Sequence, residues 1–145
     1  RAAVPGAVVE IPDVPLDLAS LASVREFGAH MRERGEAVDV LCLNAGRGGA
    51  AHDTLEVTVD KREAIMQVNL LSHALLVHEL LPNLRKSSYV RIVAHSSSAR
   101  SNTDPSMVDD LDAKWRSAHP WRQYSLSKAG LCLFMVRATM GMAVY

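Results

Sequence analysis

Tyr124 and Lys128 lie four residues apart at the start of an apolar segment near the end of the chain. Residues at i and i+4 share one face of a helix, with about 5–6 Å between their Cβ atoms. A free phenol has a pKa of about 10, and lowering it to about 7 takes roughly 4 kcal/mol. One ammonium group about 4 Å away supplies roughly that energy at an effective dielectric constant of ~20. The pair therefore predicts a tyrosine that exchanges protons near neutral pH.

The elements that would position this pair alternate between short apolar segments and longer helical ones. Segment 38–43 is almost continuously apolar, which is typical of a strand buried on both faces of a parallel sheet. We expect strands at 8–11, 38–43 and 89–94, and helices between Ser20 and Gly35, from residue 58 or 60 to 81, and over 124–140. This order predicts a parallel α/β sheet.

Two local signals mark the expected first helix, and one long polar segment separates the last strand from the last helix. Ser20 suits the N-cap position, and Gly35 suits the position just past the C-terminus. Residues 100–123 are polar and contain His119-Pro120 as a helix breaker, so they are expected to form an inserted loop. Trp115 and Trp121 are expected to anchor that loop.

Composition excludes several classes of function. The 145 residues are 48% hydrophobic, enough for one domain with a buried core. The 16 basic and 16 acidic residues balance, so nothing favours nucleic acid or an anionic membrane as partner. No uninterrupted apolar run is long enough to span a membrane. The six histidines show no metal-ligand spacing, and no metal is expected.

The two cysteines bear on the cellular compartment. Cys42 and Cys132 both lie in apolar segments, which predicts buried, reduced thiols. A disulfide between them is the less favoured alternative. The expected location is therefore an intracellular, reducing compartment, either the cytoplasm or an organelle.

Unusual polar residues follow each expected strand, and one lies inside the long helix. Asp17 follows the first strand, Asn44-Ala45-Gly46 the second, and Ser96–Ser98 the third. In open parallel sheets, ligands bind at the carboxyl ends of the strands. Asn69 is a poor helix former in the middle of a helix. Each position also has a structural alternative: a helix start, a turn, a polar strand end and a hydrogen-bonded core amide.

Taken in order, these residues resemble the short-chain dehydrogenase/reductase family over almost the whole chain. The resemblance places the family's catalytic serine at Ser97, with Ser96 as the alternative. Tyr124 follows Ser97 by 27 residues, an interval similar to that of the retinol-dehydrogenase-like and protochlorophyllide-reductase-like branches. The segments that carry the resemblance are Leu16-Asp17-Leu18, Leu43-Asn44-Ala45-Gly46, Asn69, Ser97 and Tyr124-x-x-x-Lys128.

The resemblance implies a fold and a reaction. The fold is a Rossmann-like three-layer α/β/α arrangement with a parallel sheet, and residues 1–145 form a single, partial NAD(P)-binding domain from the family's third strand to the Tyr-Lys helix. The reaction is hydride transfer between NAD(P)(H) and a small-molecule carbonyl or alcohol. Tyr124 would exchange the proton, Lys128 would lower its pKa and hold the nicotinamide ribose, Ser97 would bind the substrate oxygen, and Asn69 would position a relay water.

The resemblance also implies contacts to the cofactor. Asp17 and Leu18 would approach the adenine. Asn44, Ala45 and Gly46 would let the cofactor pass close to the backbone, because glycine has no Cβ to obstruct it. Tyr124 and Lys128, described above, complete the set. The branch resemblance favours NADP(H) over NAD(H).

One departure from the family leaves two hypotheses open. The glycine-rich turn that would seat the pyrophosphate is not in the sequence, and Gly46-Arg47-Gly48-Gly49 lies on the wrong element to replace it. The favoured hypothesis is an oxidoreductase whose sequence is recorded in part. The alternative is a non-catalytic, dehydrogenase-like subunit of a larger assembly. A homodimer through the long helix and the Tyr124 helix is compatible with either.

Overall fold

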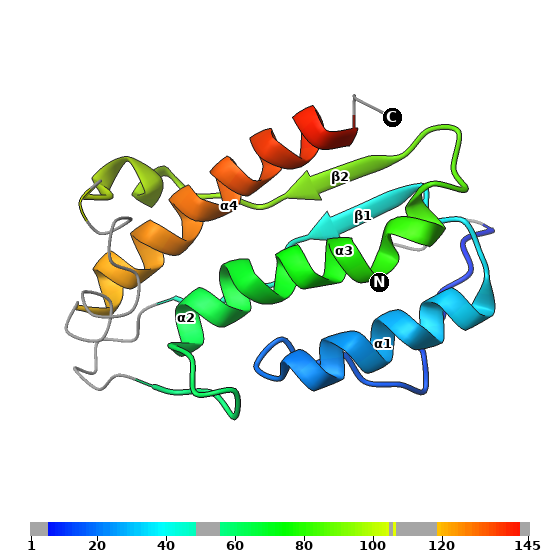
Figure 1. Ribbon diagram of the computed structural model, residues 1–145, viewed down its shortest axis with the longest axis horizontal. Coiled ribbons are helices and arrows are strands. Elements are labelled where there is room, and N and C mark those ends of the chain that lie inside the picture. The colour runs from blue at the N-terminus through cyan, green and yellow to red at the C-terminus, as the bar shows by residue number, and fades with distance from the viewer. Residues whose placement is uncertain (1–5, 49–55, 105, 107–118, 143–145) are drawn as a thin grey trace.

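A computed structural model describes residues 6–48, 56–104, 106 and 119–142. The chain forms a parallel α/β arrangement, as predicted (Figure 1). Its elements are α1 (Leu21–Arg34), β1 (Val40–Leu43), α2 (Ala64–Met66), η1 (Gln67–Leu71), α3 (Ser72–Leu84), β2 (Arg91–Ala94), η2 (Ser98–Asn102) and α4 (Pro120–Met142).

Strands β1 and β2 pair in parallel and present one face to the helices. Leu41 lies opposite Ile92, and Leu43 lies opposite Ala94. These four side chains pack into the apolar core that α1, α3 and α4 complete. Leu43 is 1% exposed. The carboxyl ends of both strands therefore point toward the same edge of the domain, as Figure 1 shows.

The opposite face of the sheet is open in the part of the chain that the structure describes. Val40 and Val93 are about half exposed. Cys42, which shares a face of β1 with Val40 and lies opposite Val93, is exposed. The prediction that segment 38–43 is buried on both faces is therefore wrong, as is the predicted burial of the Cys42 thiol. The reason is that α1, α3 and α4 pack on the other face (Figure 1). Both cysteines are free thiols.

Residues 8–11 do not form the expected strand. Val8, Val9 and Ile11 are each at least 85% exposed, and the segment has no regular secondary structure. A strand is stable only when a neighbour satisfies its backbone hydrogen bonds. No described strand lies beside this segment, so the apolar pattern alone does not produce one.

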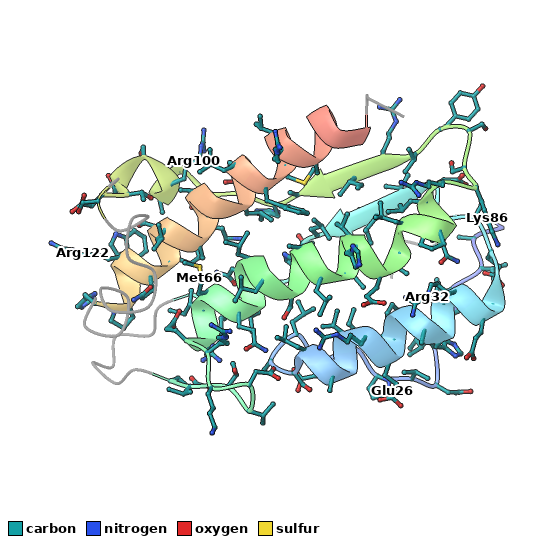
Figure 2. The ribbon with its side chains drawn as sticks, viewed as in Figure 1. Glu26, Arg32, Met66, Lys86, Arg100 and Arg122 are labelled. Atoms are coloured by element: carbon teal, nitrogen blue, oxygen red, sulfur yellow. The ribbon has the colours of Figure 1, made fainter. Side chains whose placement is uncertain are left out.

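Helix α1 begins and ends where its caps predict. The Ser20 hydroxyl accepts a first-turn backbone N–H, and Gly35 ends the helix with φ of 69° in the left-handed region. Contacts to α3 then fix its position. Arg32 pairs with Glu79, and Lys86 donates to the Gly35 carbonyl at 2.6 Å (Figure 2).

The long helix covers 64–84, later at both ends than predicted. Residues 58–63 form a turn with Lys61 at a φ of 59°, and the buried Glu63 carboxylate accepts the backbone N–H groups of Ile65 and Met66 at the start of α2. Pro82 lies inside the helix and does not end it. By length and composition this helix could cross a membrane, but 56% of the relevant window is buried in the domain. It is the central core helix of the fold.

Helix α4 starts four residues earlier than expected. Pro120 is its first residue, not a breaker, because the missing proline N–H is one of the helix's unpaired donors in any case. Trp121 is half exposed on α4 and stacks on the Tyr124 ring with centroids 5.6 Å apart. Trp115 lies outside the described residues.

Candidate active site

Asn69 lies in a π-helical turn, η1, near the N-terminus of the long helix. Such turns are rare and occur often at functional sites. The Asn69 amide is fully buried and bonds in two directions. Its Oδ1 accepts the Arg47 N–H at 2.8 Å, and its Nδ2 donates to the Arg47 carbonyl at 2.9 Å and to Ser127 Oγ at 3.0 Å. One side chain therefore joins the loop after β1 to helix α4.

Lys128 lies beside Tyr124 on the buried face of α4, as their spacing predicts. The lysine is 3% exposed, and its Nζ lies 5.8 Å from the centre of the Tyr124 ring. Nζ donates to the carbonyl of His95 at 2.7 Å. The ammonium group is therefore held at the carboxyl end of β2.

Gly46 brings the loop after β1 against both of these groups. A Cβ at this position would lie 3.2 Å from Asn69 Oδ1 and 3.4 Å from Lys128 Nζ. Asn44 and Ala45, which precede it, are exposed. The glycine thus allows a close approach between the loop, the amide and the ammonium, while the preceding residues stay open to a ligand.

The two candidate serines after β2 have different surroundings. Ser96 Oγ is turned toward α4, 3.0 Å from Cys132 Sγ and 3.4 Å from the Lys128 carbonyl. Ser97 Oγ accepts the Ala99 N–H at 3.2 Å and caps η2. This bond uses a lone pair of Ser97 and leaves its O–H proton available to a substrate oxygen.

Asp17 and Leu18 form a corner immediately before α1. The Asp17 carboxylate accepts the Ala19 N–H at 2.8 Å. The Leu18 carbonyl accepts from Ser72 Oγ at 2.7 Å and from Gln67 Nε2 at 3.4 Å. Side chains at both ends of the η1 turn therefore attach this corner to the helical segment that carries Asn69.

Arg47 is a charged residue of the site that sequence reasoning did not single out. Its guanidinium pairs with the Glu56 carboxylate, with one bond at 2.9 Å. This hydrogen bond raises the pKa of Arg47 and lowers the pKa of Glu56. Asn69 binds the backbone N–H and carbonyl of the same Arg47, so the Arg47–Glu56 ion pair belongs to the rim of this site.

His73 is a second residue that sequence reasoning missed. It is 2% exposed, and its Nδ1 has no hydrogen-bond partner among the described residues. Burial lowers the pKa of His73, and the charge of Lys128 lowers it further. Its position four residues after Asn69, on the same face of the helix, was the available signal.

The lowered pKa of His73 predicts a loss of stability in acid. The unfolded chain takes up a proton as pH falls below the ordinary pKa of 6.5, and the folded chain resists it. The free energy of unfolding should therefore decrease below that pH. Urea denaturation across this range measures it, and His73→Gln should remove most of the slope. His78→Gln is the matched control, because that imidazole is exposed on the same helix. An unchanged slope in His73→Gln would contradict the assignment.

Comparison with known proteins identifies the family of this chain. Residues 6–109 match the family profile described as short chain dehydrogenase. The chain belongs to the short-chain dehydrogenase family. It is 40% identical to human retinol dehydrogenase 13 over 121 residues, 82% of this chain and 35% of that protein. It is also 40% identical to rice chloroplastic protochlorophyllide reductase B, over 62% of this chain and 23% of the relative. Both predicted branch resemblances are confirmed.

Solved structures of the family share the fold. A Mycobacterium paratuberculosis protein has a TM-score of 0.73 at 31% identity, covering 89% of this chain and 44% of its own. NADPH-bound carbonyl reductase from chicken fatty liver has a TM-score of 0.61 at 27% identity, covering 88% and 51%. This chain therefore spans about a quarter to a third of these curated relatives and about half of these structures. The Rossmann-like class is confirmed, and the described residues form two of its layers.

Proposed function

We propose that the protein is an NAD(P)(H)-dependent oxidoreductase that transfers a hydride between the nicotinamide and a small-molecule carbonyl or alcohol carbon. The observation that carries this proposal is the buried Lys128 ammonium beside the Tyr124 ring, fixed by the His95 carbonyl. A nicotinamide cofactor, when bound, supplies the hydride. The chain's own residues then have to bind the substrate oxygen and move one proton.

Four residues divide this work. Tyr124 gives its proton to the developing alkoxide in reduction and accepts it in oxidation. Lys128 places its positive charge beside that tyrosine and holds the nicotinamide ribose. Ser97 donates to the substrate oxygen. Asn69, joined to the loop after β1 and to α4, positions a water that supplies the proton.

The cofactor would lie along the carboxyl ends of the strands. Asn44, Ala45 and Gly46 leave the backbone open to it, and Asp17 with Leu18 would meet the adenine. We favour NADP(H) over NAD(H), because related structures hold NADP or NADPH. No metal takes part in this scheme. The free thiols favour a reducing compartment.

Ligand binding and turnover by the full-length native protein test the proposal. NADPH should bind with a dissociation constant in the micromolar range, measured by the fluorescence of the reduced nicotinamide. Aldehydes and ketones, with retinal in the panel, should then cause a substrate-dependent loss of its absorbance that a metal chelator does not inhibit. Absence of NADPH binding would overturn the proposal.

The open sheet face favours a second candidate, a non-catalytic subunit of a larger assembly. Val40, Cys42 and Val93 form an exposed apolar surface that a partner could cover. A homodimer would instead use the outer surfaces of α3 and α4. A stable complex with another protein, together with no NADPH binding, would select the non-catalytic candidate.

A further inference from the structure

We propose that Gln67 and Ser72 are positioning residues that hold the Asp17–Leu18 corner for the adenosine half of the dinucleotide. This inference rests on the proposed function, because it takes that corner to be the adenine contact. It adds two residues that do not contact the predicted proton relay and are not among the segments on which the family resemblance was recognised. They act through one backbone group, the Leu18 carbonyl.

Gln67 is fully buried, and its side chain joins the corner to the turn before α2. Nε2 donates to the Leu18 carbonyl at 3.4 Å and to Asp60 Oδ2 at 2.8 Å, and Oε1 accepts from Thr58 Oγ1 at 2.6 Å. A buried amide is costly unless it is hydrogen-bonded. Both ends of the Gln67 amide are paired, so its hydrogen bonds and not its volume alone define its place in the core.

Ser72 makes the shorter of the two bonds to Leu18. It is fully buried and donates to the carbonyl at 2.7 Å. Gln67 and Ser72 enclose the π-helical turn, so Asn69 lies between them in the chain. Five residues of helix extend about 8 Å. The Asp17–Leu18 corner and Asn69, which mark the two predicted ends of the cofactor site, are therefore both fixed to one segment of the core helix.

Asp60 extends this clamp to the N-terminus of α1. Its Oδ2 accepts the Leu21 N–H at 2.8 Å and the Gln67 amide together. A carboxylate near the first turn stabilises a helix, and it also repels an anion there. The N-terminus of α1 is thus not a phosphate site. The Asp17–Leu18 corner, with its fixed Leu18 carbonyl, is therefore the part of this segment that would meet an uncharged adenine.

The test separates cofactor affinity from turnover in the full-length protein. Gln67→Met keeps the side-chain volume and removes the amide, and Ser72→Ala removes only the hydroxyl. Each should weaken NADPH and adenosine monophosphate about fivefold to tenfold, measured by calorimetry. At saturating NADPH, kcat should stay within about twofold of the parent. The corner amides 18–21 should also exchange hydrogen faster.

Asn83→Leu is the matched control. Asn83 is a buried amide on the same helix that donates to the Met31 and Glu36 carbonyls at 2.8 Å, at the far end of α1. It should lower the melting temperature without changing the affinity for either ligand. Unchanged affinities in both Gln67→Met and Ser72→Ala overturn the inference alone. A parent protein that binds no NADPH overturns the proposed function and this inference together.

Discussion

Tyr124→Phe should yield a folded protein that binds NADPH but turns over roughly 10²- to 10⁴-fold more slowly. The substitution removes only the phenolic oxygen. The ring can still stack on Trp121, whose centroid lies 5.6 Å away, so the local packing of α4 should be unchanged. The loss should appear in kcat, because under the proposed function the phenol transfers the proton to the developing alkoxide, while the other predicted contacts to the cofactor are unchanged.

Tyr89→Phe makes the same chemical change at an exposed site. Tyr89 is 80% exposed before β2, so its variant should turn over like the parent. Rates are compared at saturating NADPH and substrate, with circular dichroism to confirm folding. Equal turnover in Tyr124→Phe and the parent would remove this tyrosine from the mechanism. Loss of NADPH binding in Tyr124→Phe would instead assign it a binding role.

Features governed by neighbours in sequence could be predicted from the sequence. The Ser20 cap and the Gly35 terminus bound α1 as expected, because a capping side chain and a left-handed glycine act within one turn of helix. The apolar segments ending at Leu43 and Ala94 became β1 and β2 for a related reason. Each is short and is bounded by polar strand ends.

Features that depend on distant partners could not be predicted in the same way. Residues 8–11 are mostly apolar, as β1 is, yet only β1 has a described strand beside it. The exposure of Cys42 depends on which face the helices cover, and periodicity does not determine that. Lys61 at positive φ delayed the start of the long helix, which a propensity argument does not anticipate.

The candidate site shows the same division. Asn69 was predicted as a site residue partly because asparagine is a poor helix former, and its three hydrogen bonds explain its place in the helix. Gln67 is equally buried but carried no signal, because glutamine is an ordinary helix former. His73 is also buried, and its only signal was its position four residues after Asn69, because it matched no metal spacing. The π-helical turn that contains Gln67 and Asn69 is a backbone feature without a sequence signature.

Lys128→Met should abolish turnover and yet stabilise the fold by about 1–3 kcal/mol. The ammonium is 3% exposed, and among the described residues no carboxylate forms an ion pair with it. A buried charge without a counter-ion is costly, and one hydrogen bond to the His95 carbonyl offsets only part of the cost. Methionine fills a similar volume without that cost, so under the proposed function this position trades stability for the proton chemistry.

The variant should also change the acid sensitivity of His73. The charge of Lys128 helps to lower the pKa of that imidazole, so Lys128→Met should bring the pKa closer to 6.5 and reduce the loss of stability below that pH. Urea denaturation at several pH values measures both effects. Lys86→Met, at an exposed lysine that donates to the Gly35 carbonyl, should give no gain in stability. If Lys128→Met lowered the free energy of unfolding as much as a core cavity does, the lysine would be a structural residue. The cost assigned to its buried charge would then be wrong.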